Sequence, residues 1–162
     1  MIGRLLLSAC LLLLCACASK APLPEHSPHL SLPMQLHILR EQAEQRQDWL
    51  LVIQQETAGL RWSLMDPLGI PVARQRLVDG AWQADGLLPP NPQARELFAA
   101  LLFALTPATE LHDNYPLARV ETGRRDLGKR WNVEYRQPQV FDLHMEQGVT
   151  YRVSPLNDEV SP

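Results

Sequence analysis

The stretch "NPQARELFAALLFALTP", residues 91–107, carries the clearest helical signal in this chain of 162 residues. Asn91 is suited to accept a hydrogen bond as the N-cap, and Pro92 suits the first helical position, where no amide hydrogen is needed. Large apolar residues recur at helical spacing on one broad face: Leu97, Phe98, Leu101, Leu102 and Leu105. A helix this apolar needs a large concave partner, and a curved sheet supplies one.

Strand-like segments lie on both sides of this helix. Before it, apolar residues alternate or cluster in 34–39, 48–55, 59–66 and 70–80, and Trp82 begins a return strand. After it, the same pattern recurs in 117–121, 129–136, 140–145 and 149–154. Short turn signals such as Asp79-Gly80 connect them, so we expect antiparallel strands. The predicted fold class is α+β: an open antiparallel β-sheet, or half-barrel, wrapped around an apolar helix, in a domain spanning 34–156 and followed by a tail at 157–162.

The N-terminus resembles an export signal, which we place at residues 1–16. Arg4 supplies a positive start, and an apolar run of about ten residues follows, too short for a bilayer that needs roughly 20 helical residues. A bacterial lipoprotein signal has an aliphatic residue three positions before the acylated cysteine and a small residue directly before it. Cys17, in "LCAC", satisfies this with a full-length apolar run ahead of it.

Two alternatives to Cys17 stay open. Cys10, in "LSAC", fits the pattern letter by letter but has only about five apolar residues ahead of it, and Cys15 follows a bulky leucine. The chain also fits an ordinary secretory signal cut near Ala18. With Cys17 acylated, for example by palmitate, several acyl chains would hold the protein firmly on a membrane. Because no aspartate follows Cys17, we expect sorting to the outer membrane, with the domain in the periplasm.

Residues 17–33 are rich in proline, which favours an extended spacer between lipid and domain. His26 and His29 lie three positions apart in this segment, which raises the possibility of a metal site. No third ligand or carboxylate pattern lies nearby, so the favoured interpretation is a solvated tether, with no metal and no cofactor.

Composition excludes some function classes. The formal net charge is -3 and no long run of lysine or arginine occurs, so nucleic acid is not an expected partner. All cysteines lie within the first 17 residues, which leaves no thiol for an internal disulfide or for nucleophilic catalysis.

Little in the chain indicates catalysis. GxSxG, P-loop and HExxH motifs are absent from the sequence. Glu110, His112 and Asp113 gather after the helix, and a hydrolase interpretation would make His112 a base oriented by Asp113. The alternative is a solvated loop, since adjacent side chains seldom point the same way. We therefore expect a protein that is not an enzyme.

The tryptophans Trp49, Trp62, Trp82 and Trp131 all fall in predicted strands. Each fits core packing, and several of them together fit the lining of a cavity wide enough for an acyl chain. The candidate cavity-lining residues are Trp62, Leu64, Trp82, Phe98, Leu101 and Trp131.

The segment "DPLGIP", residues 66–71, predicts a loop between two strands, because its prolines and glycine interrupt a ladder. Leu68 and Ile70 lie at its tip. They fit either of two roles: packing down on the domain, or contact with a membrane or an acyl ligand.

These features together resemble the outer-membrane lipoprotein receptor LolB and its soluble relative LolA. The stretch "MDPLGIPVARQRLVDGAWQADGLLPPNPQARELFAALLFALTP", residues 65–107, is more similar to an uncharacterised family of proteobacterial lipoproteins whose genes often neighbour fatty-acid-like synthesis genes for aryl polyenes. The LolB resemblance implies an unclosed barrel with an apolar interior, covered by helices, that accepts acyl chains. It also implies that Leu68 matches the loop leucine that helps to transfer or insert lipoprotein, and that a periplasmic carrier protein is a partner.

Three functional hypotheses follow. The first is a non-enzymatic outer-membrane lipoprotein that binds, and transfers or inserts, an acyl or polyene lipid or a lipidated cargo. The second is a structural or assembly lipoprotein that acts through protein contacts with an envelope machine. The third is a periplasmic hydrolase that uses His112. A hollow interior favours the first hypothesis, and a filled interior favours the second.

Overall fold

The computed structural model describes residues 20–156. The predicted signal peptide, Cys17 and the tail at 157–162 lie outside the described residues. The described elements are β1 (Met34–Gln42), β2 (Gln45–Glu56), β3 (Gly59–Met65), β4 (Pro71–Val78), β5 (Ala81–Ala84), α2 (Pro92–Leu105), α3 (Ala108–Asn114), β6 (Arg119–Glu121), β7 (Arg124–Leu127), β8 (Trp131–Gln137), β9 (Val140–Met145) and β10 (Thr150–Pro155).

All ten strands form one open sheet in the order β5-β4-β3-β2-β1-β10-β9-β8-β7-β6. The strands β1–β5 form one meander and β6–β10 form another, and every neighbouring pair is antiparallel. The two meanders join where β1 pairs with β10, with Ile38 opposite Val153. The predicted open antiparallel sheet is confirmed.

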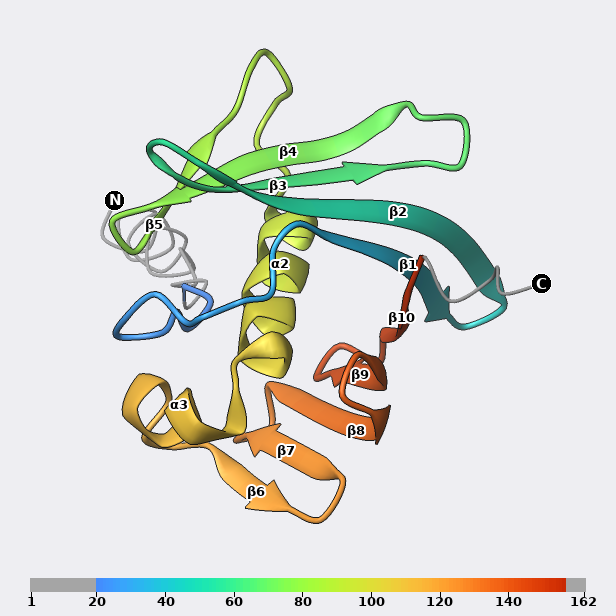
Figure 1. Cartoon of the computed structure of the whole chain (residues 1–162). Helices are drawn as coiled ribbons and strands as arrows, with labels where there is room; N and C mark the ends of the chain where they lie inside the picture. Colours follow the sequence, from blue (N-terminus) through green and yellow to red (C-terminus); the bar gives the residue numbers. More distant parts are fainter. Residues whose placement is uncertain (1–19, 157–162) are drawn as a thin grey trace, which may run out of the picture.

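The sheet curves around α2, which runs through its concave side (Figure 1). Alternate residues of the strands point inward, as in β1, where Leu36 and Ile38 are buried and Gln35 is exposed. On α2, all seven residues from 97 to 103 are fully buried, because side chains from both meanders surround the helix. The helix predicted around 91–107 is therefore confirmed as the centre of the core.

Both ends of α2 are held by side chains. Asn91 is the N-cap, and its Oδ1 accepts the amide hydrogen of Ala94 at 3.0 Å, as the sequence predicted. At the other end, Arg125 donates through Nη1 to the carbonyl oxygen of Thr106 at 2.6 Å, and the Tyr135 hydroxyl donates to that of Ala104 at 2.6 Å. These two donors satisfy carbonyls that a helix C-terminus leaves without a partner.

Two turns in the first meander require particular backbone conformations. Asp79 and Gly80 both have positive φ, 48° and 69°, which suits the tight hairpin predicted between β4 and β5. Gly59 has φ 142°, and a Cβ there would lie 2.1 Å from the carbonyl oxygen of Leu77. Glycine is therefore the residue that allows β3 to begin against β4.

Two elements differ from the sequence-based expectations. The short hairpin of β6 and β7 includes Arg124–Leu127, which was not predicted as a strand because charged residues hide its alternation. The segment around Glu110 to Asn114 forms α3 rather than the expected solvated loop. It buries Leu111 against the core, and one buried leucine is too weak a periodic signal to reveal a helix of seven residues.

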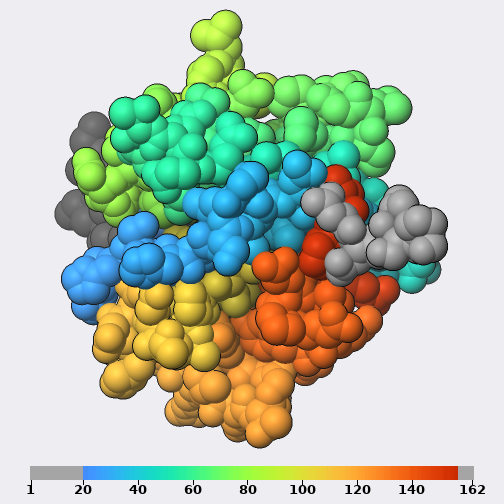
Figure 2. Space-filling view, viewed as in Figure 1, coloured from blue at the N-terminus to red at the C-terminus, as the bar shows by residue number. Residues whose placement is uncertain are grey.

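Residues 20–33 lie along the domain, whereas the sequence predicted a solvated spacer. Ala21, Leu23, Leu30 and Leu32 pack against the core. In Figure 2 this blue segment lies between the green strands and the yellow helical region. The reason is long-range polar pairing with α3, which sequence alone does not reveal: the amide of His26 donates to Asn114 Oδ1 at 2.8 Å.

Candidate functional site

The loop between β3 and β4 is held in shape by one carboxylate. Asp66 Oδ1 accepts the amide hydrogens of Leu68 at 2.9 Å and of Ile70 at 2.8 Å. The Asp66 amide also donates to the carbonyl oxygen of Ile70, and the Gly69 amide donates to the carbonyl oxygen of Asp66, both at 2.9 Å. Such side-chain-to-backbone bonds stabilise a loop without any apolar contact.

The fixed loop leaves its two aliphatic side chains in solvent. Leu68 is 85% exposed and Ile70 is 58% exposed. Neither side chain packs down on the domain, so the first of the two roles left open for them does not hold, and contact with a membrane or an acyl ligand stays a prediction. Two neighbouring aliphatic residues held in water by a preformed loop are suited to contact with an apolar partner.

The predicted cavity-lining residues fall into two groups. Trp62, Trp82 and Phe98 are in mutual contact, with ring centroids between 5.4 and 5.8 Å apart. Trp131 lies at another part of the core, where its ring is 5.8 Å from that of Phe103. The helix therefore separates the aromatic side chains of the two meanders instead of leaving a single hollow between them.

The space between sheet and helix is densely occupied. Trp62, Leu64, Phe98, Leu101 and Trp131 are each fully buried. None of the five hollows identified on the described part of the chain is lined by any of these five residues. Trp82, half-buried, is the exception among the cavity candidates, because it lines an open hollow of about 440 Å³ together with Ala21, Leu23 and Ala81.

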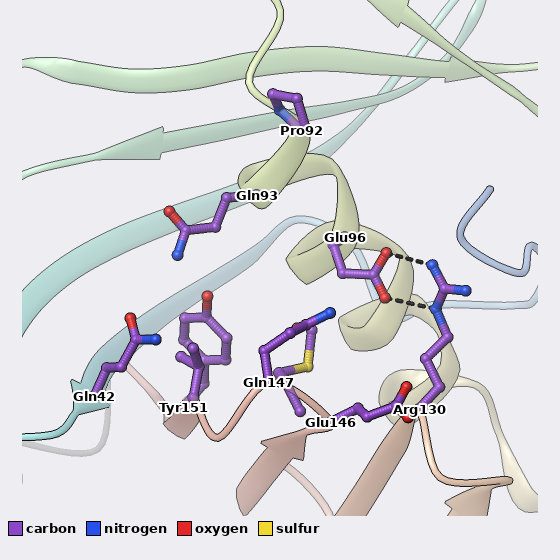
Figure 3. Close-up of a pocket in the computed structure, with 10 residues that line it drawn as sticks. Gln42, Pro92, Gln93, Glu96, Arg130, Glu146, Gln147 and Tyr151 are labelled. Atoms are coloured by element: carbon purple, nitrogen blue, oxygen red, sulfur yellow. Dashed lines mark hydrogen bonds and ion pairs between the residues drawn. The ribbon is translucent and has the colours of Figure 1, made fainter. Parts of the chain in front are cut away.

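A second hollow, of about 480 Å³, opens beside the N-terminal turn of α2 (Figure 3). Gln93 and Glu96 approach it from the helix, and Gln42 and Tyr151 approach it from the sheet. Burial raises the pKa of the Tyr151 hydroxyl, an effect that outweighs the opposing influence of Arg40 and Gln93, so this hydroxyl is protonated at neutral pH and can donate a hydrogen bond.

Glu96 is the most strongly bonded carboxylate of the site. Arg130 donates to it through Nε and Nη2, both at 2.7 Å, and Trp131 donates through Nε1 at 2.8 Å. Burial on its own would raise the pKa of Glu96, but these hydrogen bonds and the positive charge of Arg130 hold it below the usual value. The carboxylate therefore stays ionised and ties α2 to the second meander.

Sequence reasoning missed Glu96, Arg130 and Arg40. A usable signal existed for Arg40 alone, because it continues the inward-facing alternation of Leu36 and Ile38 on β1. Glu96 and Arg130 are 34 positions apart, and no local pattern links them.

The residues of the hydrolase hypothesis do not form a catalytic arrangement. His112 and Asp113 are exposed on α3. Glu110 instead accepts hydrogen bonds from the backbone amide and the ring Nδ1 of His29, both at 3.0 Å. Among residues 20–156, no group of three or more potential ligands from His, Cys, Asp and Glu is placed to hold a metal ion.

No protein-family model and no curated protein sequence matches this chain. Within the described residues, no helix combines the length and the apolar character needed to cross a membrane.

Proposed function

We propose that this chain is a non-enzymatic lipoprotein, anchored in the outer membrane through Cys17 and facing the periplasm, that binds and transfers or inserts an acyl or polyene lipid or a lipidated cargo. The observation that carries this proposal is the preformed loop that holds Leu68 and Ile70 in solvent. Insertion of aliphatic side chains from the tip of a rigid loop into a bilayer is favourable, by about 25 cal/mol per Å² of apolar surface removed from water.

The architecture supports the same proposal. An open antiparallel sheet curved around an apolar helix, with a projecting loop after β3, fits the LolB-like arrangement suggested by the sequence (Figure 1). In that arrangement Leu68 corresponds to the loop leucine that contacts membrane or cargo, and a periplasmic carrier protein delivers the cargo.

The position of the N-terminal segment restricts how the domain sits on a membrane. Lys20 lines the Trp82 hollow near Gly80, at the end of β4 opposite the Leu68 loop. The eight residues of β4 extend over about 26 Å at roughly 3.3 Å each. Cys17 is three residues before Lys20, a reach of at most about 10 Å. A lipid on Cys17 and the Leu68 loop can both touch one bilayer when β4 runs along its surface.

A cargo chain needs space that α2 does not already fill. The hollow beside Trp82 offers such space without displacement of the helix, because it lies at the margin of the core and is bordered by Ala21, Leu23 and Ala81. The indole Nε1 of Trp82 is buried and donates to no acceptor among the described residues, so an ester or amide carbonyl of the cargo would satisfy it.

Vesicle binding and transfer test the proposal. In a Cys17→Ser chain, which lacks the anchor, Leu68→Asp should reduce co-sedimentation with phospholipid vesicles by about tenfold. It should also slow transfer of a fluorescent polyene fatty acid between vesicles. Leu117→Asp is the matched control, because Leu117 is also 84% exposed but lies on the connection from α3 to β6. Equal binding and equal transfer by the wild-type and Leu68→Asp chains would contradict the proposal.

The filled interior favours a second candidate function, a structural or assembly lipoprotein that acts through protein contacts. Native mass spectrometry of the purified chain separates the two candidates. A co-purified lipid favours the carrier. A lipid-free chain that co-purifies with a defined envelope complex favours the assembly role.

A further inference from the structure

Arg40 is a buried cation without a buried anion. It is 7% exposed and points inward from β1, in line with Leu36 and Ile38. In residues 20–156, no carboxylate lies within ion-pair distance of its guanidinium. Removing a charge from water is costly unless an opposite charge replaces the lost hydration, so buried arginines are normally paired.

Neutral amides surround this guanidinium instead. Its Nη1 donates to Gln47 Oε1 at 3.4 Å, and its Nη2 donates to Gln42 Oε1. The Gln93 side-chain oxygen accepts from Nη2 at 3.1 Å and from Nε at 3.2 Å, in the amide orientation that satisfies both groups. Three glutamines thus fill the positions that oxygens of an anion would otherwise take.

The same glutamines form a wall of the open hollow beside α2. Gln42 and Gln93 both line it, and the Tyr151 hydroxyl faces Gln93 across it (Figure 3). Arg40 and Tyr151 are direct cross-strand partners on β1 and β10. Tyr151, Gln42 and Gln93 therefore border about 480 Å³ of open space, and the buried guanidinium of Arg40 lies behind the two amides that it contacts.

Two carboxylates, Glu96 and Glu146, also face the hollow. Arg130 pairs with Glu96 at 2.7 Å and offsets its charge in part, and Glu146 is exposed, where solvent screens its charge. The N-terminal end of α2 adds the partial positive charge of its backbone dipole on the same side.

We propose that this hollow binds an oxyanion, a phosphate or a carboxylate, whose oxygens replace the glutamine amides on Arg40. The anion site itself does not depend on the proposed function. The proposed function enters only where this oxyanion is identified as the polar end of the lipid cargo. Arg40 and Tyr151 would then recognise the head of the ligand, while its chain follows the surface of the domain.

Thermal unfolding of the full chain in a non-ionic detergent tests the site with inorganic phosphate alone. At constant ionic strength set with chloride, phosphate should raise the midpoint of the wild-type chain by about 3 °C. Arg40→Met should abolish that shift. Arg46→Met, a control on the exposed face of β2, should retain it. No shift in the wild-type chain, or equal shifts in the wild-type and Arg40→Met chains, would overturn the inference.

A second variant keeps the test valid if Arg40→Met does not fold. Gln42→Glu is isosteric and places a carboxylate on the guanidinium that Gln42 already contacts. It should raise the midpoint without phosphate and remove the phosphate response, because the site then contains its own anion. A Gln42→Glu chain that is less stable and still responds to phosphate would contradict an anion site at Arg40.

The source of the oxyanion is distinguished by native mass spectrometry from detergent. A lipid headgroup predicts that the wild-type chain retains dihexanoylphosphatidylglycerol, whereas Arg40→Met does not, and that neutral dihexanoylglycerol is lost from both. A phosphate-induced shift without lipid retention assigns the site to a free oxyanion. The Leu68→Asp chain separates this inference from the proposed function, because it should lose vesicle binding and keep the phosphate response.

Discussion

The indole Nε1 of Trp131 donates to the carboxylate of Glu96 across 2.8 Å, and so fixes the central helix to β8. Trp131 is fully buried and Glu96 is half-buried. Arg130, the residue before Trp131, donates two further hydrogen bonds to the same carboxylate. This contact is polar, whereas the rest of the helix surface packs through apolar side chains. It therefore sets the position of α2 within the concave sheet more specifically than apolar burial alone.

Glu96→Gln should destabilise the protein by about 1–3 kcal/mol, because it removes charge-assisted hydrogen bonds from Arg130 and Trp131. Urea denaturation at neutral pH measures this loss. Glu134→Gln, on an exposed carboxylate of β8, serves as the control. Equal midpoints for the Glu96→Gln and Glu134→Gln chains would show that this contact contributes little.

The same residue predicts an acid dependence. The pKa of Glu96 is held below the ordinary glutamate value in the folded protein, so its contribution is complete above about pH 4.5 and disappears as the pH falls through the folded-state value. The wild-type chain should therefore lose its stability advantage over Glu96→Gln during acidification below that pH. An advantage that stays constant down to pH 2.5 would contradict the assignment.

Phe98→Ala should cost about 3–5 kcal/mol, because Phe98 is fully buried between Trp62 and Trp82 and its removal leaves a cavity. Leu87→Ala, at a fully exposed position, should change stability by less than about 0.5 kcal/mol. Chemical denaturation of both variants makes the comparison. A Phe98→Ala loss below about 1 kcal/mol would indicate that the interior near Trp62 is loosely packed.

Arg125→Met should destabilise the protein by about 1–2 kcal/mol. It removes the donor that lies 2.6 Å from the carbonyl oxygen of Thr106 and the positive charge at the C-terminal end of α2. The exposed Arg119→Met on β6 is the matched control and should be near neutral. Thermal unfolding at low ionic strength provides the readout, and identical midpoints for the two variants would rule out this capping role.

Asn114→Ala should loosen residues 20–33 from the domain. Asn114 is buried, and its side-chain Oδ1 accepts the amide hydrogen of His26, a bond that alanine removes. The backbone carbonyl oxygen of residue 114, which alanine keeps, accepts the amide hydrogen of Glu25 at 3.3 Å. Hydrogen–deuterium exchange in peptides covering residues 24–30 should accelerate, while Asp113→Ala, at an exposed neighbour, should leave it unchanged. Unaltered exchange in Asn114→Ala would mean that apolar packing of Leu23 and Leu30 suffices to hold the segment.

Much of the fold follows from local patterns. The N-cap Asn91 with Pro92, the apolar face after it and the Asp79-Gly80 turn each specify their structure through nearest neighbours, and each agrees with the structure. What local patterns missed depends on distant partners. The helix α3 owes its place to one buried leucine and to contacts with residues 25–29, which lie more than 80 positions away.

The candidate site divides in the same way. The projecting loop was predictable, because the turn residues of "DPLGIP" and the Asp66 carboxylate act within five residues. Trp131 was predicted to line a cavity, and that role stays a prediction, since the structure places this residue in contact with Phe103 and Glu96 instead of along a hollow. The number of apolar side chains in the sequence does not reveal whether they fill the space between sheet and helix. The size of that space depends on the distance between α2 and the sheet.

Bilayer contact by Leu68 can be measured with a dye attached to a cysteine at that position. The native cysteines are all at positions 10, 15 and 17, so residues 18–162 contain no other thiol that the dye would label. A Leu68→Cys chain with its anchor in place can be labelled with an environment-sensitive dye and bound to vesicles containing nitroxide-labelled lipids. We expect blue-shifted emission and strong quenching at position 68, and aqueous emission without quenching for the same dye at Leu117→Cys. Aqueous emission at both positions would contradict the insertion of this loop into a membrane.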